Sequence, residues 1–135
     1  MTASGAVVLD SSALLAYLRR EAGFERVREA LSVGAAISSV NWAETLSKLF
    51  DLGVDADSVA VQLERGGILG VALRVVDFSE PMAREAARLR PLTRSLGLSL
   101  GDRACLALGK ALGTQVLTAD QSWKRVKGTR VQPIR

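Results

Sequence analysis

The sequence predicts an α/β fold in which helices flank a mostly parallel central sheet of about five short strands. Short apolar runs alternate along the chain with longer segments in which apolar residues recur every three or four positions. The chain has 135 residues, of which 48% are hydrophobic and 24% charged, a composition that suits one core. There is no internal repeat, low-complexity segment or linker, so we expect residues 1–135 to form a single domain.

The expected strands are short apolar runs that end at turn-forming or polar residues. The first, Ala6 to Leu9, contains two valines and stops at Asp10. The last is expected to be an edge strand. In chain order the expected strands cover residues 6–9, 35–37, 73–76, 115–117 and 131–134.

The expected helices are amphipathic segments, most of them ended by glycine. In the first of them Leu14, Leu15 and Leu18 lie on one face. Pro81 suits the first turn of a later helix, and Pro91 is expected to end or kink that helix. The expected helices cover residues 13–20, 24–34, 40–52, 57–63, 79–91, 99–112 and 120–126.

Composition excludes several classes of protein. The chain has no histidine, which removes Ser-His-Asp and Cys-His catalysis and zinc sites that need imidazole. Cys105 is the single cysteine, so no intramolecular disulfide forms, and we expect it to be a small buried residue. No apolar run approaches the length of a membrane span, and the start MTASGAVVLD does not resemble a signal peptide. We therefore expect a cytoplasmic protein that does not associate with membranes.

The net charge of +4 conceals an asymmetry along the chain. Residues 1–83 carry 7 basic and 11 acidic side chains, whereas residues 84–135 carry 11 basic and 3 acidic ones. Most of the basic residues are arginine, which suits bidentate contact with phosphate. A polyanionic partner explains this pattern, and so does an arginine-rich genome.

Four acidic residues follow expected strands or begin expected helices. Asp10 follows the first strand, Glu44 lies early in the helix after the second, and Asp120 closely follows the fourth. Asp102 lies at the start of the helix that begins at Ser99. The carboxyl ends of parallel strands meet at one edge of a sheet, which is where open α/β sheets place their sites.

Such a cluster of carboxylates needs a cation, because the negative charges repel one another. Oxygen ligands without histidine or cysteine select Mg²⁺ or Mn²⁺, which promote phosphodiester hydrolysis. Each acid also has an ordinary explanation in helix capping. Asp10 and Asp120 suit helix starts, and both Asn41-x-x-Glu44 and Ser99-x-x-Asp102 have the spacing of capping boxes.

Four segments carry a family resemblance: VVLDSSALLAYL, ISSVNWAETLSKL, LSLGDRACLALGKALG and VLTADQSW. Their order and spacing resemble a PIN domain over nearly the whole chain. More closely, the chain resembles VapC-type toxins, the ribonucleases of type II toxin–antitoxin pairs. The resemblance implies a PIN-like three-layer sandwich and an endoribonuclease that depends on Mg²⁺, with Mn²⁺ as the alternative ion.

The resemblance also implies roles for individual residues. The acidic cluster that binds metal and activates water would comprise Asp10, Glu44, Asp102 and Asp120, with Asp10, Asp102 and Asp120 as metal ligands. Ser12 would hold a metal-bound water or a phosphate oxygen, and Thr118 would orient the loop before the last acid. Some family members carry a further acid near the position of Ser122. In this chain Asp120 is therefore the single acid of that part of the cluster, and the number of metal ions stays open.

RNA, a cognate antitoxin and a second copy of the chain are the implied partners. Family members cut RNA to leave a 5′-phosphate and a 3′-hydroxyl, usually as homodimers, and an antitoxin silences them. Arg84, Arg88 and Arg103 are our candidates for RNA contact, although a solvated helix face or a structural salt bridge also explains them. Trp123 is expected to be a packing residue, with base stacking as the alternative.

Two other functions fit the same fold. A PIN nuclease with a housekeeping role in RNA processing would carry the same residues, and only a neighbouring antitoxin gene separates it from a toxin. A non-catalytic domain that binds RNA or protein would have no need of all four acids, and their presence argues against it.

Overall fold

The computed structural model describes residues 6–135; residues 1–5, which belong to the segment tested above for a signal peptide, lie outside the described residues. Five strands form one parallel sheet in the order β3-β2-β1-β4-β5. All five expected strands are confirmed, with ends that differ by at most one residue. They are β1 (Val7–Leu9), β2 (Ala35–Ser38), β3 (Leu73–Val76), β4 (Val116–Thr118) and β5 (Val131–Pro133).

The helices also follow the expected pattern, with differences at three places, one of which is an unpredicted 3₁₀ helix over Arg94–Leu96. The helix expected over residues 79–91 stops at Arg88, because Pro91 has no N–H with which to continue the ladder, and Pro91 instead lies in the first turn of a short helix. The segment after Asp120 is a 3₁₀ helix. The helices are α1 (Ser11–Arg19), α2 (Phe24–Val33), α3 (Ser39–Asp51), α4 (Ala56–Arg65), α5 (Glu80–Arg88), α6 (Arg90–Thr93), η2 (Arg94–Leu96), α7 (Leu100–Leu112) and η3 (Gln121–Arg125).

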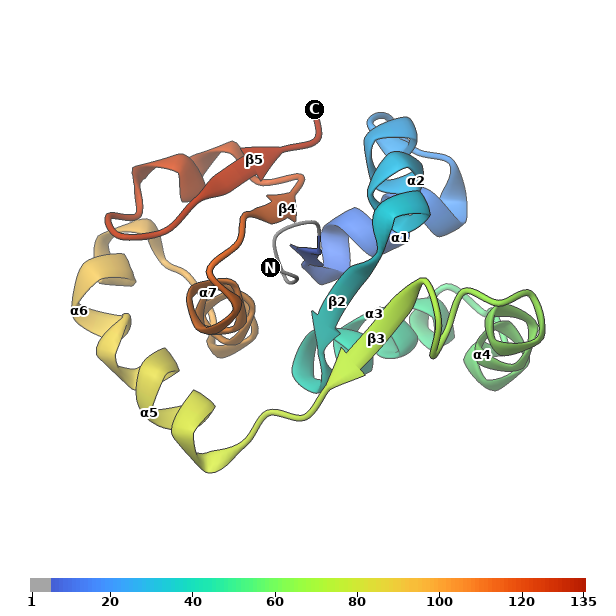
Figure 1. Cartoon of the computed structure of the whole chain (residues 1–135), viewed down its shortest axis with the longest axis horizontal. Coiled ribbons are helices and arrows are strands. Elements are labelled where there is room, and N and C mark those ends of the chain that lie inside the picture. The colour runs from blue at the N-terminus through green and yellow to red at the C-terminus, as the bar shows by residue number, and fades with distance from the viewer. Residues whose placement is uncertain (1–5) are drawn as a thin grey trace.

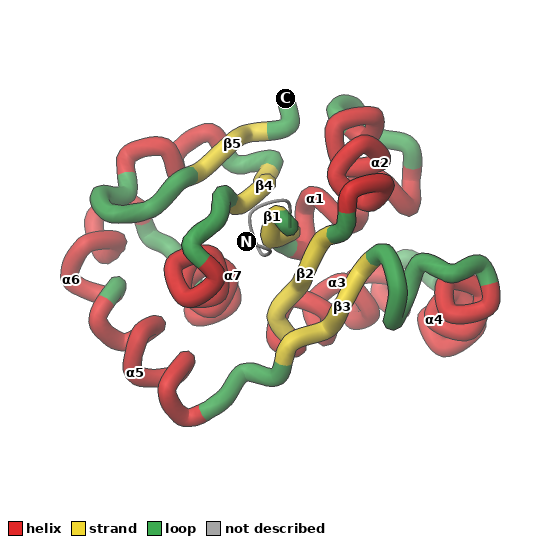
Figure 2. Tube along the Cα trace, viewed as in Figure 1, coloured by secondary structure: helices red, strands yellow, loops and turns green. Residues whose placement is uncertain are grey.

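The sheet separates two hydrophobic cores, as expected for a three-layer sandwich. Because successive strand residues face opposite sides, Val7 and Leu9 pack with α1 and α2, whereas Val8 packs with α5 and α7. The strands run as a band through the molecule in Figures 1 and 2, with α1 and α2 on one side and α5, α6 and α7 on the other. Within residues 6–135, no helix is long and apolar enough to cross a membrane.

The strand order places a crevice at a defined point. From β1 the chain builds outward through β2 to β3, then returns across the sheet to β4 and continues outward to β5. The order therefore reverses between β1 and β4, which pair directly. In open parallel sheets, ligands bind beyond the carboxyl ends of the strands at this switch point.

Candidate metal and phosphodiester site

Asp10 lies at the switch point, at the carboxyl end of β1, and is only 4% exposed. It is the N-cap of α1: its Oδ1 accepts a hydrogen bond from the Ala13 backbone N–H at 2.8 Å and another from the Ser12 hydroxyl at 2.7 Å. Burial raises its pKa from 3.8 to about 6, against the opposing effect of these hydrogen bonds. The negative charge of Asp102 raises it further. Asp10 is thus both a helix cap and a buried acid.

Thr118 ties Asp10 to the neighbouring strand end. Its hydroxyl donates to Asp10 Oδ2 at 2.6 Å and accepts from the Asp120 backbone N–H at 3.1 Å. The Ser12 hydroxyl accepts from the Ala119 N–H at 2.9 Å. Both hydroxyls therefore connect the loops after β1 and β4, and the one on Thr118 orients the loop that carries Asp120.

Asp120 is exposed and caps η3. Its Oδ1 accepts from the backbone N–H of Ser122 at 2.9 Å and from the Ser122 hydroxyl at 2.7 Å. Ser122 therefore holds the Asp120 carboxylate in place and contributes no further negative charge.

Asp102 lies in the first turn of α7, where the expected capping box with Ser99 is confirmed. The Ser99 backbone N–H donates to Asp102 Oδ2 at 2.9 Å, and the Asp102 N–H donates to the Ser99 hydroxyl at 3.1 Å. The box fixes the Asp102 side chain at the N-terminus of α7.

Glu44 reaches the same end of α7 from α3. Its carboxylate lies against Gly101, and the Asn41 side-chain amide donates to Glu44 Oε1 at 2.9 Å. The expected capping box at Asn41 is wrong: Ser38 is the N-cap of α3, and Asn41 lies inside the helix. Sequence reasoning assigned no role in the site to Asn41 or Gly101. Two features of the sequence could have indicated these residues: Asn41 lies three residues before Glu44, and Gly101 is a glycine in the first turn of a helix.

Three of the four acids line one open pocket of about 440 Å³. Glu44 lies outside it and lines a separate pocket along α3, although its charge acts on the buried region around Cys105. Burial is the main cause of the raised pKa of the Cys105 thiol, and the charges of Asp10, Asp102 and Glu44 raise it further. The pocket is lined by Asp10, Ser11, Ser12, Asp102, Ala119, Asp120, Gln121 and Trp123. As expected, Cys105 and Trp123 are buried packing residues, so the Trp123 indole is not free to stack on a base.

The donors around this pocket fit a hard divalent cation. They are carboxylate and hydroxyl oxygens, and the buried charge of Asp10 calls for a neutralising ion when it is ionised. Within residues 6–135, no three carboxylates lie close enough together to form a complete ligand set. Mg²⁺ does not need such a set, because it keeps several waters and binds proteins through one or two carboxylates.

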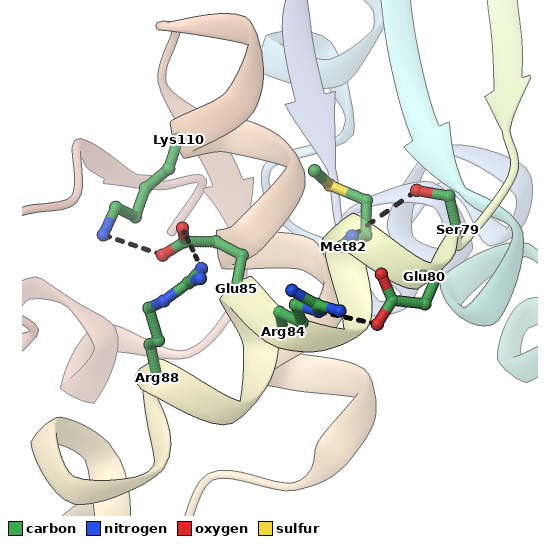
Figure 3. Close-up of polar contacts among 7 residues, drawn as sticks. All are labelled: Ser79, Glu80, Met82, Arg84, Glu85, Arg88 and Lys110. Atoms are coloured by element: carbon green, nitrogen blue, oxygen red, sulfur yellow. Dashed lines mark hydrogen bonds and ion pairs between the residues drawn. The ribbon is translucent and has the colours of Figure 1, made fainter.

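The arginines that we considered for RNA contact make contacts within the protein. Figure 3 shows Arg88 and Lys110 both directed at the Glu85 carboxylate, at 3.3 and 3.0 Å, and Arg84 directed at Glu80, at 2.7 Å. Lys110 has the largest part in lowering the pKa of the Glu85 carboxyl, and Arg88 lowers it further. Arg103 donates to the Ala86 carbonyl of α5 at 3.0 Å and so joins α7 to α5.

Comparison with known proteins identifies the fold. Residues 7–129 match the PIN domain family. Among solved structures, the chain is similar to VapBC2 from Rickettsia felis bound to a promoter DNA fragment, at 19% identity and a TM-score of 0.71, covering 95% of this chain and 98% of that one. It is also similar to FitAcB from Neisseria gonorrhoeae, at 22% identity and a TM-score of 0.70, covering 93% and 95%. A third similar structure is the toxin–antitoxin family member VapBC-5 from Mycobacterium tuberculosis, at 21% identity and a TM-score of 0.57, covering 97% and 98%.

No curated protein matches the sequence. The structural likeness shows a shared fold, and the family match extends over most of the chain, from β1 to the loop before β5. This chain therefore belongs to the PIN-domain family.

Proposed function

We propose that this chain is a divalent-metal-dependent endoribonuclease and the toxin of a type II toxin–antitoxin pair. The observation that carries the nuclease proposal is the pocket at the β1–β4 switch point, where Asp10, Asp102 and Asp120 converge from three separate segments. A capping role explains each acid singly, but it does not explain why all three line one pocket.

The chain's own residues have distinct tasks in this proposal. Asp10, Asp102 and Asp120 would hold the cation, with Asp10 and Asp102 as its most direct ligands. When bound, Mg²⁺ or Mn²⁺ would supply polarisation of the phosphodiester and a bound water that loses its proton more readily than free water does. Thr118 and Ser12 fix the orientation of Asp10, and Ser122 fixes that of Asp120. Glu44 adds negative charge next to Gly101, the residue before Asp102.

RNA is the proposed substrate because the second part of the chain is strongly basic. After Asp120 the sequence holds five basic residues and no acid. Within the described chain, the exposed side chains of Lys124, Arg125 and Lys127 form no ion pair, whereas Arg84 and Arg88 do. The segment from Lys124 to Lys127, at the end of η3, is therefore better suited to hold phosphates than the α5 surface.

An antitoxin and a second copy of the chain are the proposed protein partners. Support comes from the similar solved structures, several of which are toxin–antitoxin complexes. A housekeeping PIN nuclease would have the same pocket, so a neighbouring antitoxin gene whose product binds and inhibits this chain is the discriminating finding. Such a pair would act in the cytoplasm.

The nuclease proposal is tested by incubating the purified protein with transfer RNAs and ribosomal RNA fragments in Mg²⁺, Mn²⁺ or EDTA. We expect discrete cuts with either metal, none in EDTA, and none from an Asp10→Asn preparation purified in the same way. Equal cutting by the two proteins would assign the activity to a contaminant. Absence of cuts by folded, antitoxin-free protein would favour the non-catalytic binding domain.

RNA contact is tested with the Asp10→Asn protein, which binds without cutting. Dissociation constants measured across a range of salt concentrations report the number of phosphates contacted. We expect Lys124→Gln with Lys127→Gln to weaken binding and flatten the salt dependence, whereas Arg84→Gln with Arg88→Gln, the matched control, leaves both nearly unchanged. The opposite ranking would restore the α5 surface as the RNA-contacting one.

A further inference from the structure

Asn41 makes a bridge between α3 and α7 that a residue inside a helix does not need for its own stability. It is 1% exposed, and its Nδ2 donates both to Glu44 Oε1 and to the Gly101 carbonyl, each at 2.9 Å. Its Oδ1 is buried without a hydrogen-bond partner. The orientation of the amide is determined by the two acceptors, because the reversed amide would direct oxygen at both of them.

Gly101 completes the arrangement by leaving room for Glu44. A Cβ atom at this position would lie 2.1 Å from Glu44 Oε2 and 2.6 Å from its Cδ. The backbone of Gly101 is helical, without the positive φ that would call for glycine. Space for the carboxylate, and not chain conformation, is therefore what requires glycine between Leu100 and Asp102.

We propose that Asn41 is a positioning residue, which together with Gly101 holds the Glu44 carboxylate against the first turn of α7, the turn that carries the metal ligand Asp102. This inference rests on the nuclease function proposed above and adds to it two residues that lie outside the acidic cluster. The amide donates two hydrogen bonds and receives none, and a buried acceptor without a donor destabilises a fold. The buried Asn41 side chain is therefore better explained by the hydrogen bonds that it donates to Glu44 and Gly101 than by the stability of α3.

The consequence concerns affinity for the cation. Glu44 and Asp102 are 58 positions apart in the sequence and lie on α3 and α7. The distance between these two residues therefore depends on how α3 packs on α7. The Asn41 amide donates both to Glu44 Oε1 and to the Gly101 carbonyl, so this one side chain sets how the Glu44 carboxylate lies relative to the start of α7. Replacing a group that hydrogen-bonds a metal ligand typically changes metal affinity about 10- to 100-fold, and we expect Asn41, which is one step further from Asp102, at the lower end of that range.

The test measures Mn²⁺ binding from the electron paramagnetic resonance signal of free Mn²⁺, without RNA and without turnover. We expect Asn41→Ala to weaken Mn²⁺ binding about tenfold in the wild-type background. In a Glu44→Gln background the same change should produce no further loss, because the charge to be positioned is absent. Thr45→Val is the matched control, since it removes a buried side-chain hydrogen bond to the Asn41 carbonyl in the same helix.

A second variant covers the case in which Asn41→Ala does not fold. Gly101→Ala puts a methyl group where the Glu44 carboxylate lies, while alanine favours the helix. We expect it to weaken Mn²⁺ binding to a similar extent without lowering the melting temperature, whereas Thr45→Val should lower the melting temperature and leave Mn²⁺ binding unchanged.

The outcomes separate this inference from the nuclease proposal. Wild-type Mn²⁺ affinity in Asn41→Ala or Gly101→Ala, or an equal loss with and without the Glu44 carboxylate, would overturn the positioning role and leave the nuclease standing. Failure of the wild-type protein to bind Mn²⁺ would overturn the metal-dependent nuclease and the positioning role together.

Discussion

The proposed site has two parts that are built in different ways. The strand-end part, Asp10, Ser12, Thr118 and Asp120, lies on the loops after two paired strands and is joined by hydrogen bonds between those loops. The helix part lies on α3 and α7 and is joined by one amide. It consists of Asn41, Glu44, Gly101 and Asp102.

This difference separates a rigid part from an adjustable one. In the strand-end part, the backbone ladder between β1 and β4 fixes the positions of Asp10 and Thr118, and both Asp10 oxygens have donors. In the helix part, the distance between Glu44 and Asp102 follows from side-chain packing between helices. The strand-end part therefore depends on the pairing of β1 with β4, and the helix part depends on how α3 packs on α7.

The largest effect is expected from Asp10→Asn. Loss of a charged ligand should reduce RNA cleavage by at least about 100-fold, because the cation is no longer held and the phosphodiester is not polarised. The amide oxygen still accepts from the Ala13 N–H, so α1 keeps its cap. Circular dichroism and thermal melting should show an intact fold with an equal or higher melting temperature at pH 7, since a buried charge is removed. Cleavage at the wild-type rate would refute the assignment.

The pH dependence of stability should also distinguish the strand-end part. The pKa of Asp10 is about 6 in the folded protein and 3.8 in the reference state, so between these values the native state holds the proton more tightly than the unfolded chain. The contribution of Asp10 to the free energy of unfolding is therefore most favourable below about pH 4. It falls by about 3 kcal/mol in total as the pH rises through 6.

Urea unfolding in EDTA from pH 4 to 7 measures this contribution as the difference between the wild-type protein and Asp10→Asn. We expect the difference in unfolding free energy to change with pH in the sense given above, and added Mg²⁺ to restore stability at pH 7. A difference that is independent of pH would contradict the burial of an ionisable Asp10.

A smaller effect is expected from Thr118→Val, which keeps the shape of the side chain and removes its hydroxyl. Asp10 then loses a hydrogen bond that lowers its pKa, and the Asp120 N–H loses its acceptor. We expect the Asp10 pKa to rise above about 6 in an NMR titration of the metal-free protein, and RNA cleavage to fall about tenfold. An unchanged titration would show that Thr118 does not support Asp10.

The smallest effect is expected outside the site, at the ion pairs on α5 and α7 drawn in Figure 3. Lys110→Met removes the cation nearest to Glu85, whose side chain also contacts Arg88. Because these groups are partly exposed, stability should fall by less than about 1 kcal/mol, and Mg²⁺-dependent cleavage should be unchanged. A large loss of cleavage would mean that this surface contacts the substrate.

The same division explains what the sequence could predict. The strands and the acids at their ends follow from local patterns, because Asp10 must come where β1 stops and Asp120 shortly after β4. The order of β1 and β4, the bridge from Thr118 to Asp10, and the contact between Glu44 and Gly101 join residues far apart in the chain. No local pattern carries such information, so Asn41 was misinterpreted as a cap when its partner lies in another helix.

The most direct test of the account is the position of the cation itself. In a crystal grown with Mn²⁺ and measured above and below the manganese absorption edge, the anomalous difference map locates the ion without reference to activity. We predict a peak in the pocket lined by Asp10, Asp102 and Asp120, with oxygen ligands at carboxylate distances from at least one of these acids. An empty pocket at saturating Mn²⁺, or a peak only elsewhere on the surface, would contradict the central claim.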